Sequence, residues 1–282
     1  MKKPVELEIS VSGLTLTAQV WGSENKPVIL ALHGWLDNAE SFAPLAAHLT
    51  EYRLIALELP GHGHSGHLPE GCYYHFIDSA RIVLEAMNAL GLQSVKLMGH
   101  SLGGAIATVV AGTFPERVEK LVFIDSFGTL VDAPADSPAS LRKHVEQWQE
   151  LQAKQMPVYP DVRKAAVARV VVGDLDFENA LLLAHRGTKQ VPGGVTWRTD
   201  PRLRVHSALR LTEAQAQAFL GAITAPCLFI LASKGLEFVR KGAELRKACV
   251  RNLQEVEIEG GHHVHMQNPA LTADAIREFL AD

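Results

Sequence analysis

Short apolar runs alternate with amphipathic stretches over the first 125 residues of the chain. Residues 5–20 alternate apolar and polar positions around Ser12-Gly13, which predicts an antiparallel hairpin. The run at residues 28–32 is continuously apolar, as in a strand covered on both faces. Further strands, which are mostly apolar, are predicted at residues 53–59, 94–98 and 120–125. Stretches with helical spacing separate these runs, at residues 39–49, 78–90 and 104–111. This alternation predicts right-handed crossovers and a mostly parallel sheet.

The alternation stops after residue 125, and the next strong strand candidate covers residues 227–231. The segment between them contains its own helical repeats, at residues 141–151, 162–170, 177–184 and 212–220. Thr212 and Gln215 have the spacing of a capping box, which marks the start of the last of these helices. An excursion of this kind predicts a helical cap over the carboxyl edge of the sheet.

We therefore expect two parts in the chain. Residues 1–127 and 222–282 are predicted to form an α/β core, and residues 128–221 a helical cap. A last strand at residues 253–258 and a helix that begins at Asn268-Pro269 complete the predicted core.

The segment Gly99-His100-Ser101-Leu102-Gly103 matches the pattern G-x-S-x-G and stands between a predicted strand and a predicted helix. A serine on such a sharp turn is held in strained backbone geometry, with its hydroxyl exposed above the edge of the sheet. The flanking glycines let the strand and the helix approach closely, and the start of the helix offers N–H groups to a developing negative charge. Ser101 is therefore the candidate nucleophile.

A serine hydroxyl needs a base within hydrogen-bond reach, and a third group must orient that base. The run Gly260-Gly261-His262-His263-Val264-His265 lies between the last predicted strand and the last predicted helix, so we expect the base in this cluster. A second group of histidines, His62, His64 and His67, raises the alternative of a metal site. Neither group contains a carboxylate or a thiolate, and the spacings match no common zinc pattern. We therefore expect no metal and no cofactor.

The composition is typical of a globular protein and argues against several classes. The 282 residues are 47% hydrophobic, which suits one large α/β domain with an insertion. The net charge of −4 and the lack of a basic stripe argue against a nucleic-acid partner. We see neither a signal-peptide pattern nor the ~20 apolar residues of a membrane helix, and therefore expect no membrane partner. The widely spaced Cys72, Cys227 and Cys249 indicate a reducing, cytoplasmic setting.

The chain resembles the α/β-hydrolase superfamily over nearly its whole length. The matching segments are His33-Gly34-Trp35, Leu59-Pro60-Gly61-His62-Gly63-His64-Ser65, the Ser101 turn, and the tail from Gly261-His262 to Pro269. Within the superfamily the chain is most similar to the serine hydrolase-like proteins, through Trp197-Arg198-Thr199-Asp200-Pro201-Arg202-Leu203-Arg204 and Leu209-Arg210-Leu211-Thr212. The resemblance implies an α/β-hydrolase fold: a mostly parallel eight-stranded sheet with helices on both faces and a helical cap inserted after strand six.

The resemblance also assigns the base and the oxyanion hole. Family tails place the catalytic histidine seven positions before the proline, which here is His262 before Pro269. The family's oxyanion hole uses the backbone N–H after the nucleophile, here Leu102, and one from the loop after the third strand, here Trp35. Both donors act on charge that exists only in the tetrahedral intermediate.

The acid of the triad is where the chain departs from the family pattern. Most relatives carry it after the seventh strand, where this chain has Gly235, and a glycine cannot orient an imidazole. Asp125 ends the sixth strand, a position that some relatives use, although an aspartate there also commonly caps the following turn. Glu237, two residues beyond Gly235, is the alternative acid. A Ser–His dyad, or an acid from the cap such as Asp174 or Asp200, are further alternatives.

The function expected from these residues is that of a serine hydrolase. It would cleave a small, mainly apolar carboxylic ester or related acyl substrate through an acyl-enzyme. Ser101 argues against haloalkane dehalogenases and epoxide hydrolases, which carry aspartate at this turn. Carbon–carbon hydrolase, thioesterase, lactonase and perhydrolase activities stay open, because they share the triad and differ in the cap. A slow-turnover ligand-binding or signalling protein on the same fold is the alternative class, suggested by the missing acid at residue 235.

Overall fold

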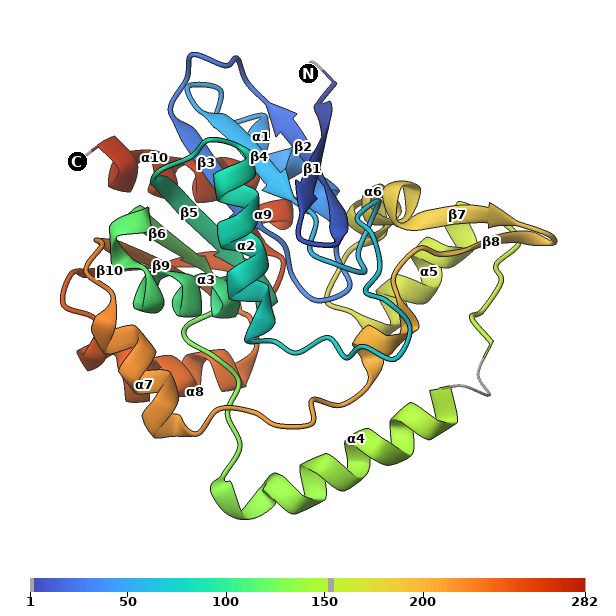
Figure 1. Ribbon diagram of the computed structural model, residues 1–282. Helices are drawn as coiled ribbons and strands as arrows, with labels where there is room; N and C mark the ends of the chain where they lie inside the picture. The colour runs from blue at the N-terminus through green and yellow to red at the C-terminus, as the bar shows by residue number, and fades with distance from the viewer. Residues whose placement is uncertain (1–2, 152–154, 282) are drawn as a thin grey trace.

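The computed structural model describes residues 3–151 and 155–281 of the chain. Its centre is an eight-stranded sheet with the strand order β1-β2-β4-β3-β5-β6-β9-β10 (Figure 1). In chain order these strands are β1 (Val5–Val11), β2 (Leu14–Trp21), β3 (Val28–Leu32), β4 (Arg53–Leu57), β5 (Val95–His100), β6 (Val118–Ile124), β9 (Cys227–Lys234) and β10 (Leu253–Gly261). Strand β2 pairs antiparallel with β1 and β4, and the remaining pairs are parallel. The predicted fold class and the predicted hairpin are confirmed.

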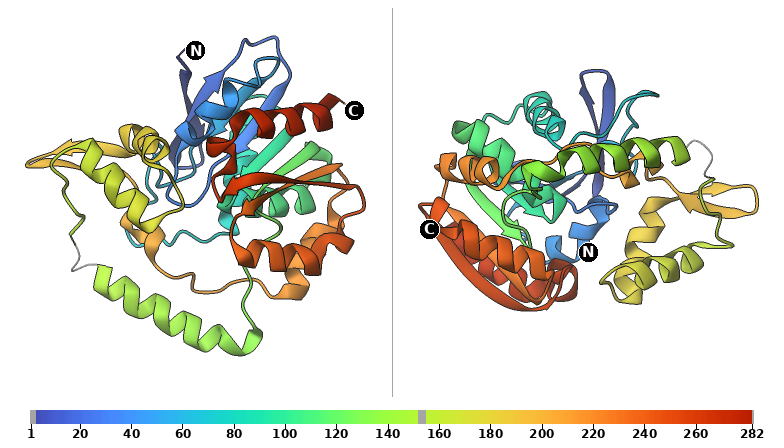
Figure 2. Two further views of the ribbon diagram at one scale, coloured as in Figure 1. Left: turned by 180° about the vertical axis from the view of Figure 1, so that it is seen from behind. Right: turned by 90° about the horizontal axis from the view of Figure 1, so that it is seen from below.

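Helices cover both faces of the sheet (Figures 1 and 2). One face packs against α2 (Asp78–Ala89), α3 (Leu102–Thr113), α7 (Glu213–Ala222) and α8 (Glu237–Arg246). The other packs against η1 (Ala39–Phe42), α1 (Ala43–Ala46), α9 (Val264–Gln267) and α10 (Pro269–Ala281). Further 3-10 turns are η2 (Pro115–Arg117), η3 (Pro134–Asp136), η4 (Pro201–Arg204) and η5 (Lys247–Cys249). Among the described residues, no helix combines the length and the apolar character that crossing a membrane requires.

The segment expected as one helix over residues 39–49 consists of two short pieces, η1 and α1. Asn38 caps the first piece, because its side chain accepts the N–H of Glu40 at 3.1 Å. Pro44 lies in the first turn of α1 and has no N–H to donate to a preceding carbonyl. The regular helical hydrogen bonding is therefore broken between the two pieces.

The chain leaves the sheet after β6 and returns at β9, and we call residues 128–221 between them the insertion. Besides η3, η4 and most of α7, it contains α4 (Ser137–Leu151), α5 (Val162–Val172), α6 (Phe177–Gly187) and a hairpin of β7 (Thr188–Val191) and β8 (Gly194–Trp197). Helices α5 and α6 pack on each other and on Met266 of α9, whereas α4 lies apart from the sheet in Figure 1 and in the left view of Figure 2. The division into a core and a cap domain stays a prediction.

The sequence predicted the start of α7 in the insertion but not the β7–β8 hairpin. The capping box of Thr212 and Gln215 at the start of α7 is confirmed. The β7–β8 hairpin was not predicted, because each of its strands has four residues and is too short to show a two-residue period.

A group of charges centred on the buried side chains of Arg186 and Glu58 joins the insertion to the core. Arg186 of α6 donates through Nε to Oε1 of Glu58 at 2.7 Å and through Nη1 to Oε1 of Glu6 in β1 at 2.7 Å. The side chains of Arg186 and Glu58 are 7% and 0% exposed. Glu58 also accepts the backbone N–H groups of Ala39 and His64. The insertion is thereby held against the loops at the carboxyl edge of the sheet.

Candidate active site

Ser101 lies on the turn between β5 and α3, in a backbone conformation that residues other than glycine rarely adopt. Its φ is 50° and its ψ is −115°. A Cβ on Gly103 would overlap the backbone of Leu32, and one on Gly99 would overlap the backbone of Gly103. These glycines therefore let β3, β5 and the start of α3 pack closely around the turn. The hydroxyl of Ser126 donates to the Ser101 carbonyl at 2.8 Å and holds the turn from the other side.

The Ser101 hydroxyl is hydrogen bonded to His262, with 2.8 Å between Oγ and Nε2. Nδ1 of the same ring lies 2.6 Å from Oδ2 of Asp125. Because an ionised carboxylate can only accept, Asp125 keeps the ring proton on Nδ1 and leaves the lone pair of Nε2 facing the hydroxyl. The three residues follow β5, β10 and β6, whose carboxyl ends meet at one edge of the parallel sheet. The fold thus brings three distant residues into one chain of hydrogen bonds.

The backbone at the end of β9 and just after it orients the buried carboxylate of Asp125. Oδ1 accepts the N–H of Ala232 at 3.1 Å, and Oδ2 accepts the N–H of Leu236 at 3.4 Å. Gly235 lies between these two donors. A Cβ on Gly235 would overlap the Asp125 carboxylate, to which all three of its nearest atoms belong. The glycine at the position of the usual acid therefore leaves room for an acid that comes from β6.

The other candidate acids do not contact the ring of His262 in the described structure. Glu237 begins α8, and its side chain is 77% exposed and pairs with Lys241 at 2.7 Å. Asp174 accepts the backbone N–H of His262 at 2.5 Å instead of a ring nitrogen. Asp200 is the N-cap of η4.

The backbone N–H groups predicted to bind an oxyanion lie on two segments next to the serine turn. Leu102 is the first residue of α3, and the first N–H groups of a helix have no partner within the helix. Trp35 lies in the loop after β3, which pairs with β5 so that Leu32 is opposite Gly99. This loop therefore leaves the sheet beside the serine turn. The Trp35 indole donates to the carbonyl of Leu203 at 2.9 Å and so ties the loop to η4.

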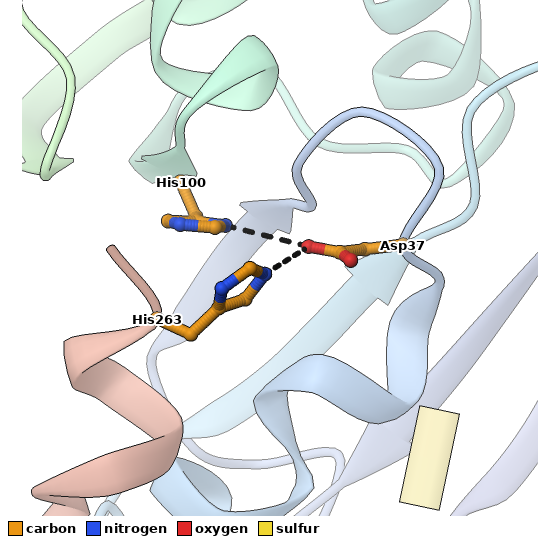
Figure 3. A group of neighbouring side chains, drawn as sticks. All are labelled: Asp37, His100 and His263. Atoms are coloured by element: carbon orange, nitrogen blue, oxygen red, sulfur yellow. Dashed lines mark hydrogen bonds and ion pairs between the residues drawn. The ribbon is translucent and has the colours of Figure 1, made fainter. Parts of the chain in front are cut away.

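A buried group of polar side chains, which Figure 3 shows, contacts His262 through His100. It consists of Asp37 from the loop after β3, His100 from the end of β5 and His263, which precedes α9. Oδ2 of Asp37 lies 3.1 Å from Nε2 of His263 and 3.6 Å from Nδ1 of His100. Arg169 of α5 donates to the other oxygen of Asp37 at 2.8 Å. Nε2 of His100 donates to the backbone carbonyl of His262 at 2.9 Å.

The potential ligand atoms of Asp37, His100 and His263 lie within 4.8 Å of one another, and imidazole and carboxylate are donors that a transition metal accepts. The charge of the carboxylate is already balanced, however. Burial by itself raises the pKa of Asp37, but the charges of His263 and Arg169 and the hydrogen bond from His263 outweigh it, so the pKa lies well below its usual value. Burial lowers the pKa of His100 well below its usual value, so this ring is neutral. Arg169 therefore supplies the positive charge that a metal would provide.

Sequence reasoning missed the charged partners of this group. Asp37 and Arg169 lie far along the chain from the histidines of residues 262–265, and no spacing connects them. The only signal was that Asp37 closely follows the His33-Gly34-Trp35 turn. The other histidines considered as metal ligands, in the loop of residues 60–71, form no such group among the described residues.

Known proteins share the sequence and the architecture of this chain. The profile of the alpha/beta hydrolase fold family matches residues 27–269. The chain belongs to the α/β-hydrolase fold family. A serine hydrolase-like protein of Danio rerio is 30% identical over 286 residues, which cover 98% of this chain and 88% of the relative. This α/β-hydrolase is therefore a member of the serine hydrolase-like group that its sequence resembles.

Solved structures of α/β-hydrolase architecture agree closely with this one. A hypothetical protein of Pseudomonas aeruginosa PAO1 is 37% identical, with a TM-score of 0.91 over 98% of this chain and 99% of that chain. The thioesterase domain from the curacin biosynthetic pathway is 25% identical, with a TM-score of 0.82 over 97% and 99% of the two chains. The shared fold brings the serine turn and the loop after β10 to one edge of the sheet, but a fold by itself does not select a substrate.

Proposed function

We propose that this α/β-hydrolase cleaves a small, mainly apolar carboxylic ester or a related acyl substrate through an acyl-enzyme intermediate. The proposal rests on one observation, the continuous hydrogen bonding from Ser101 Oγ through the His262 ring to Asp125, at 2.8 and 2.6 Å. A hydroxyl is a weak nucleophile unless a base removes its proton, and an oriented imidazole is such a base. We assign Ser101, His262 and Asp125 as the catalytic triad.

In the acylation step, Oγ of Ser101 attacks the acyl carbonyl carbon while its proton passes to Nε2 of His262. Asp125 stays ionised and stabilises the imidazolium that forms. The carbonyl oxygen becomes an oxyanion, which we assign to the N–H groups of Leu102 and Trp35. Such a donor contributes about 3 kcal/mol, because the full charge exists only in the transition state and the intermediate. The intermediate then expels the leaving group, which takes the proton from Nε2.

In the deacylation step, a water molecule takes the place of the leaving group. His262 accepts a proton from this water as its oxygen attacks the acyl carbonyl carbon. The bond to Oγ of Ser101 then breaks, and the serine oxygen regains its proton from Nε2. The products are a carboxylic acid and the alcohol or thiol released earlier, and the enzyme returns to its starting protonation state.

The apolar character of the substrate is inferred from side chains that the insertion leaves exposed. Large apolar side chains with 43% to 79% of their surface exposed are Leu141 and Val145 of α4 and Val167 and Val171 of α5. Trp35, whose N–H is the proposed oxyanion donor, is 48% exposed. Apolar walls with a few polar groups are typical of sites that bind small organic substrates.

The test combines turnover with covalent labelling. We expect sustained hydrolysis of p-nitrophenyl acetate and butyrate and stoichiometric labelling of Ser101 by a fluorophosphonate. Ser101→Ala should lose both, whereas Ser10→Ala, which changes an exposed serine of β1, should keep both. A wild-type protein that hydrolyses no ester and resists the probe would contradict the proposal.

The same assay separates the alternative functions. A thioester belongs in the substrate panel, because one of the similar solved structures is a thioesterase domain. A lactone and a carbon–carbon bond substrate complete it, since these reactions use the same triad. A slow-turnover binding protein would release one equivalent of product and then stop.

A reducing cytoplasmic setting is part of our proposal, supported by the free thiols of Cys72, Cys227 and Cys249.

A further inference from the structure

Both backbone polar groups of His262 are held by side chains of other segments. Its carbonyl accepts a hydrogen bond from Nε2 of His100 at 2.9 Å, and its N–H donates to Oδ2 of Asp174 at 2.5 Å. His100 precedes the nucleophile Ser101 directly in the chain, whereas Asp174 belongs to the insertion, between α5 and α6. The base is therefore held between the serine turn on one side and the insertion on the other.

The chain makes room for Asp174 at the residue before the base. A Cβ on Gly261 would overlap the Asp174 carboxylate, and its three nearest atoms all belong to that side chain. Gly261 does not have the positive φ that favours glycine, so its backbone conformation is open to other residues. A larger residue at position 261 is therefore excluded by the Asp174 side chain and not by the backbone conformation.

Further contacts keep this arrangement in place. Oε1 of Gln267 accepts the N–H of Gly261 at 2.6 Å, and Nε2 of Gln267 donates to the Asp174 carbonyl at 3.5 Å. Leu175, next to Asp174, is buried with Met266 of α9 in the apolar cluster beneath α5 and α6. The carboxylate is therefore carried by a segment that is packed against the loop of the base.

We infer that Asp174 is a positioning residue for the catalytic base. Its carboxylate holds the backbone of His262 so that one ring meets both Ser101 and Asp125 at hydrogen-bond distance. A residue of the insertion then raises the rate of the chemical steps by positioning His262. This role is separate from substrate binding by the insertion. This inference rests on the proposed function.

The first test compares two replacements of Asp174. Asp174→Ala removes the acceptor, and we expect kcat to fall about tenfold while KM changes less than about threefold. The rate of fluorophosphonate labelling should fall by the same factor, because labelling needs the activated serine. Asp174→Asn retains an acceptor oxygen without the charge, and it should recover kcat to within about threefold of the wild type.

The second test uses the glycine next to the base. Gly261→Ala should lower kcat about tenfold in the wild-type background, because its methyl group displaces the Asp174 carboxylate. In the Asp174→Ala background, Gly261→Ala should lower kcat less than about twofold, because two changes that remove the same interaction are not additive.

The matched control is Asp176→Ala. Asp176 lies two residues further along the same loop and caps α6 by accepting the N–H of Asn179 at 2.9 Å. This replacement weakens the helix start without touching His262, so it should lower the melting temperature and leave kcat unchanged. An equal loss of kcat in Asp176→Ala would mean that general loosening of the insertion is responsible, and it would overturn the inference.

The remaining outcomes are equally decisive. The inference is wrong if Asp174→Ala keeps kcat within twofold, or if Asp174→Asn is as slow as Asp174→Ala. If the wild type shows no turnover or labelling, the proposed function fails, and the positioning role is then decided by NMR. The Nδ1 proton of His262, bonded to Asp125, should give a resolved resonance in the wild type and Asp174→Asn and a shifted or lost one in Asp174→Ala. An unchanged resonance would overturn the inference without any reference to activity.

Discussion

The carboxylate of Asp125 fills the space that any side chain on Gly235 would need. The two residues belong to neighbouring strands of the sheet, since Asp125 follows β6 and Gly235 follows β9. Residue 235, where the family resemblance leads one to expect the triad acid, therefore has no side chain, and the carboxylate of Asp125 after the adjacent strand contacts Nδ1 of His262. This relationship leads to two predictions about activity.

Replacement of the acid should have a large effect. Asp125→Asn keeps the shape of the side chain but lets the wrong tautomer of His262 form, so we expect kcat to fall by about 10⁴-fold. Glu237→Gln changes an exposed residue that pairs with Lys241, and kcat should stay within about twofold of the wild type. Steady-state hydrolysis of p-nitrophenyl butyrate measures both. The reverse ranking would transfer the role of the acid to Glu237.

Enlargement of Gly235 should also damage the site. The methyl group of Gly235→Ala displaces the Asp125 carboxylate, and we expect kcat to fall about a hundredfold, the usual cost of moving a catalytic group by an ångström. The matched control is Gly242→Ala in α8, whose added methyl group would have only the Arg246 side chain nearby, at 3.4 Å or more. The control should keep full activity. Equal activity in the two variants would show that Gly235 does not have to make room for the acid.

Acid should destabilise the protein through its buried histidines. Burial lowers the pKa of His265 and of His62 to about 3, whereas an unfolded histidine has a pKa of about 6.5. Between these values the unfolded state binds more protons than the native state. The free energy of unfolding therefore falls as the pH is lowered from about 6.5 to 3, by up to about 1.4 kcal/mol per pH unit for each histidine.

The replacement His265→Leu tests this prediction, because neither nitrogen of His265 has a hydrogen-bond partner in the described structure. Urea unfolding at pH 7 and pH 5 should show a loss of stability that is about 2 kcal/mol smaller in the variant than in the wild type. His48→Leu changes an exposed histidine and should leave the wild-type loss in place. A variant with the full wild-type loss would argue against a neutral, buried His265.

The contact between the insertion and the core should matter for stability. Arg186→Met leaves the buried carboxylate of Glu58 without its positively charged partner, and we expect the free energy of unfolding to fall by about 3–5 kcal/mol. Arg277→Met breaks ion pairs of α10 in which Arg277 is 43% exposed, and it should lower the free energy of unfolding far less, because water already screens these charges. Denaturant unfolding compares the two variants. Equal losses of unfolding free energy in the two variants would mean that the buried Arg186–Glu58 pair stabilises the protein no more than an exposed pair does.

Chelators should leave activity unchanged. The carboxylate of Asp37 is balanced by Arg169 and by a hydrogen bond from His263, so the buried group needs no metal ion to be complete. Dialysis against EDTA, followed by the ester assay, measures this. A loss of activity that added zinc restores would instead assign a metal to Asp37, His100 and His263.

Local patterns were sufficient for most elements of the core, but they did not predict α8. Short, mostly apolar runs predicted the parallel strands, because a strand between two helical layers buries both of its faces. The glycines around Ser101 predicted the sharp turn, because close packing of a strand and a helix leaves no room for side chains there. The break in the helix predicted over residues 39–49 was missed because a single proline does not disturb the periodic pattern of its neighbours. The β7–β8 hairpin was missed because a four-residue strand is too short to show a period.

The fold class, the serine turn and the histidine-containing loop after β10 could be predicted from the sequence, since each depends on contiguous residues with a local steric or hydrophobic pattern. Which carboxylate lies beside the His262 ring, and which residues hold that histidine, depends on contacts between distant segments. Asp125, Asp37 and Asp174 reach the site from separate strands and from the insertion, and their distances to His262 and its neighbours depend on how parallel strands and the insertion meet at one edge. Spacing along a chain carries no information about such distances between segments.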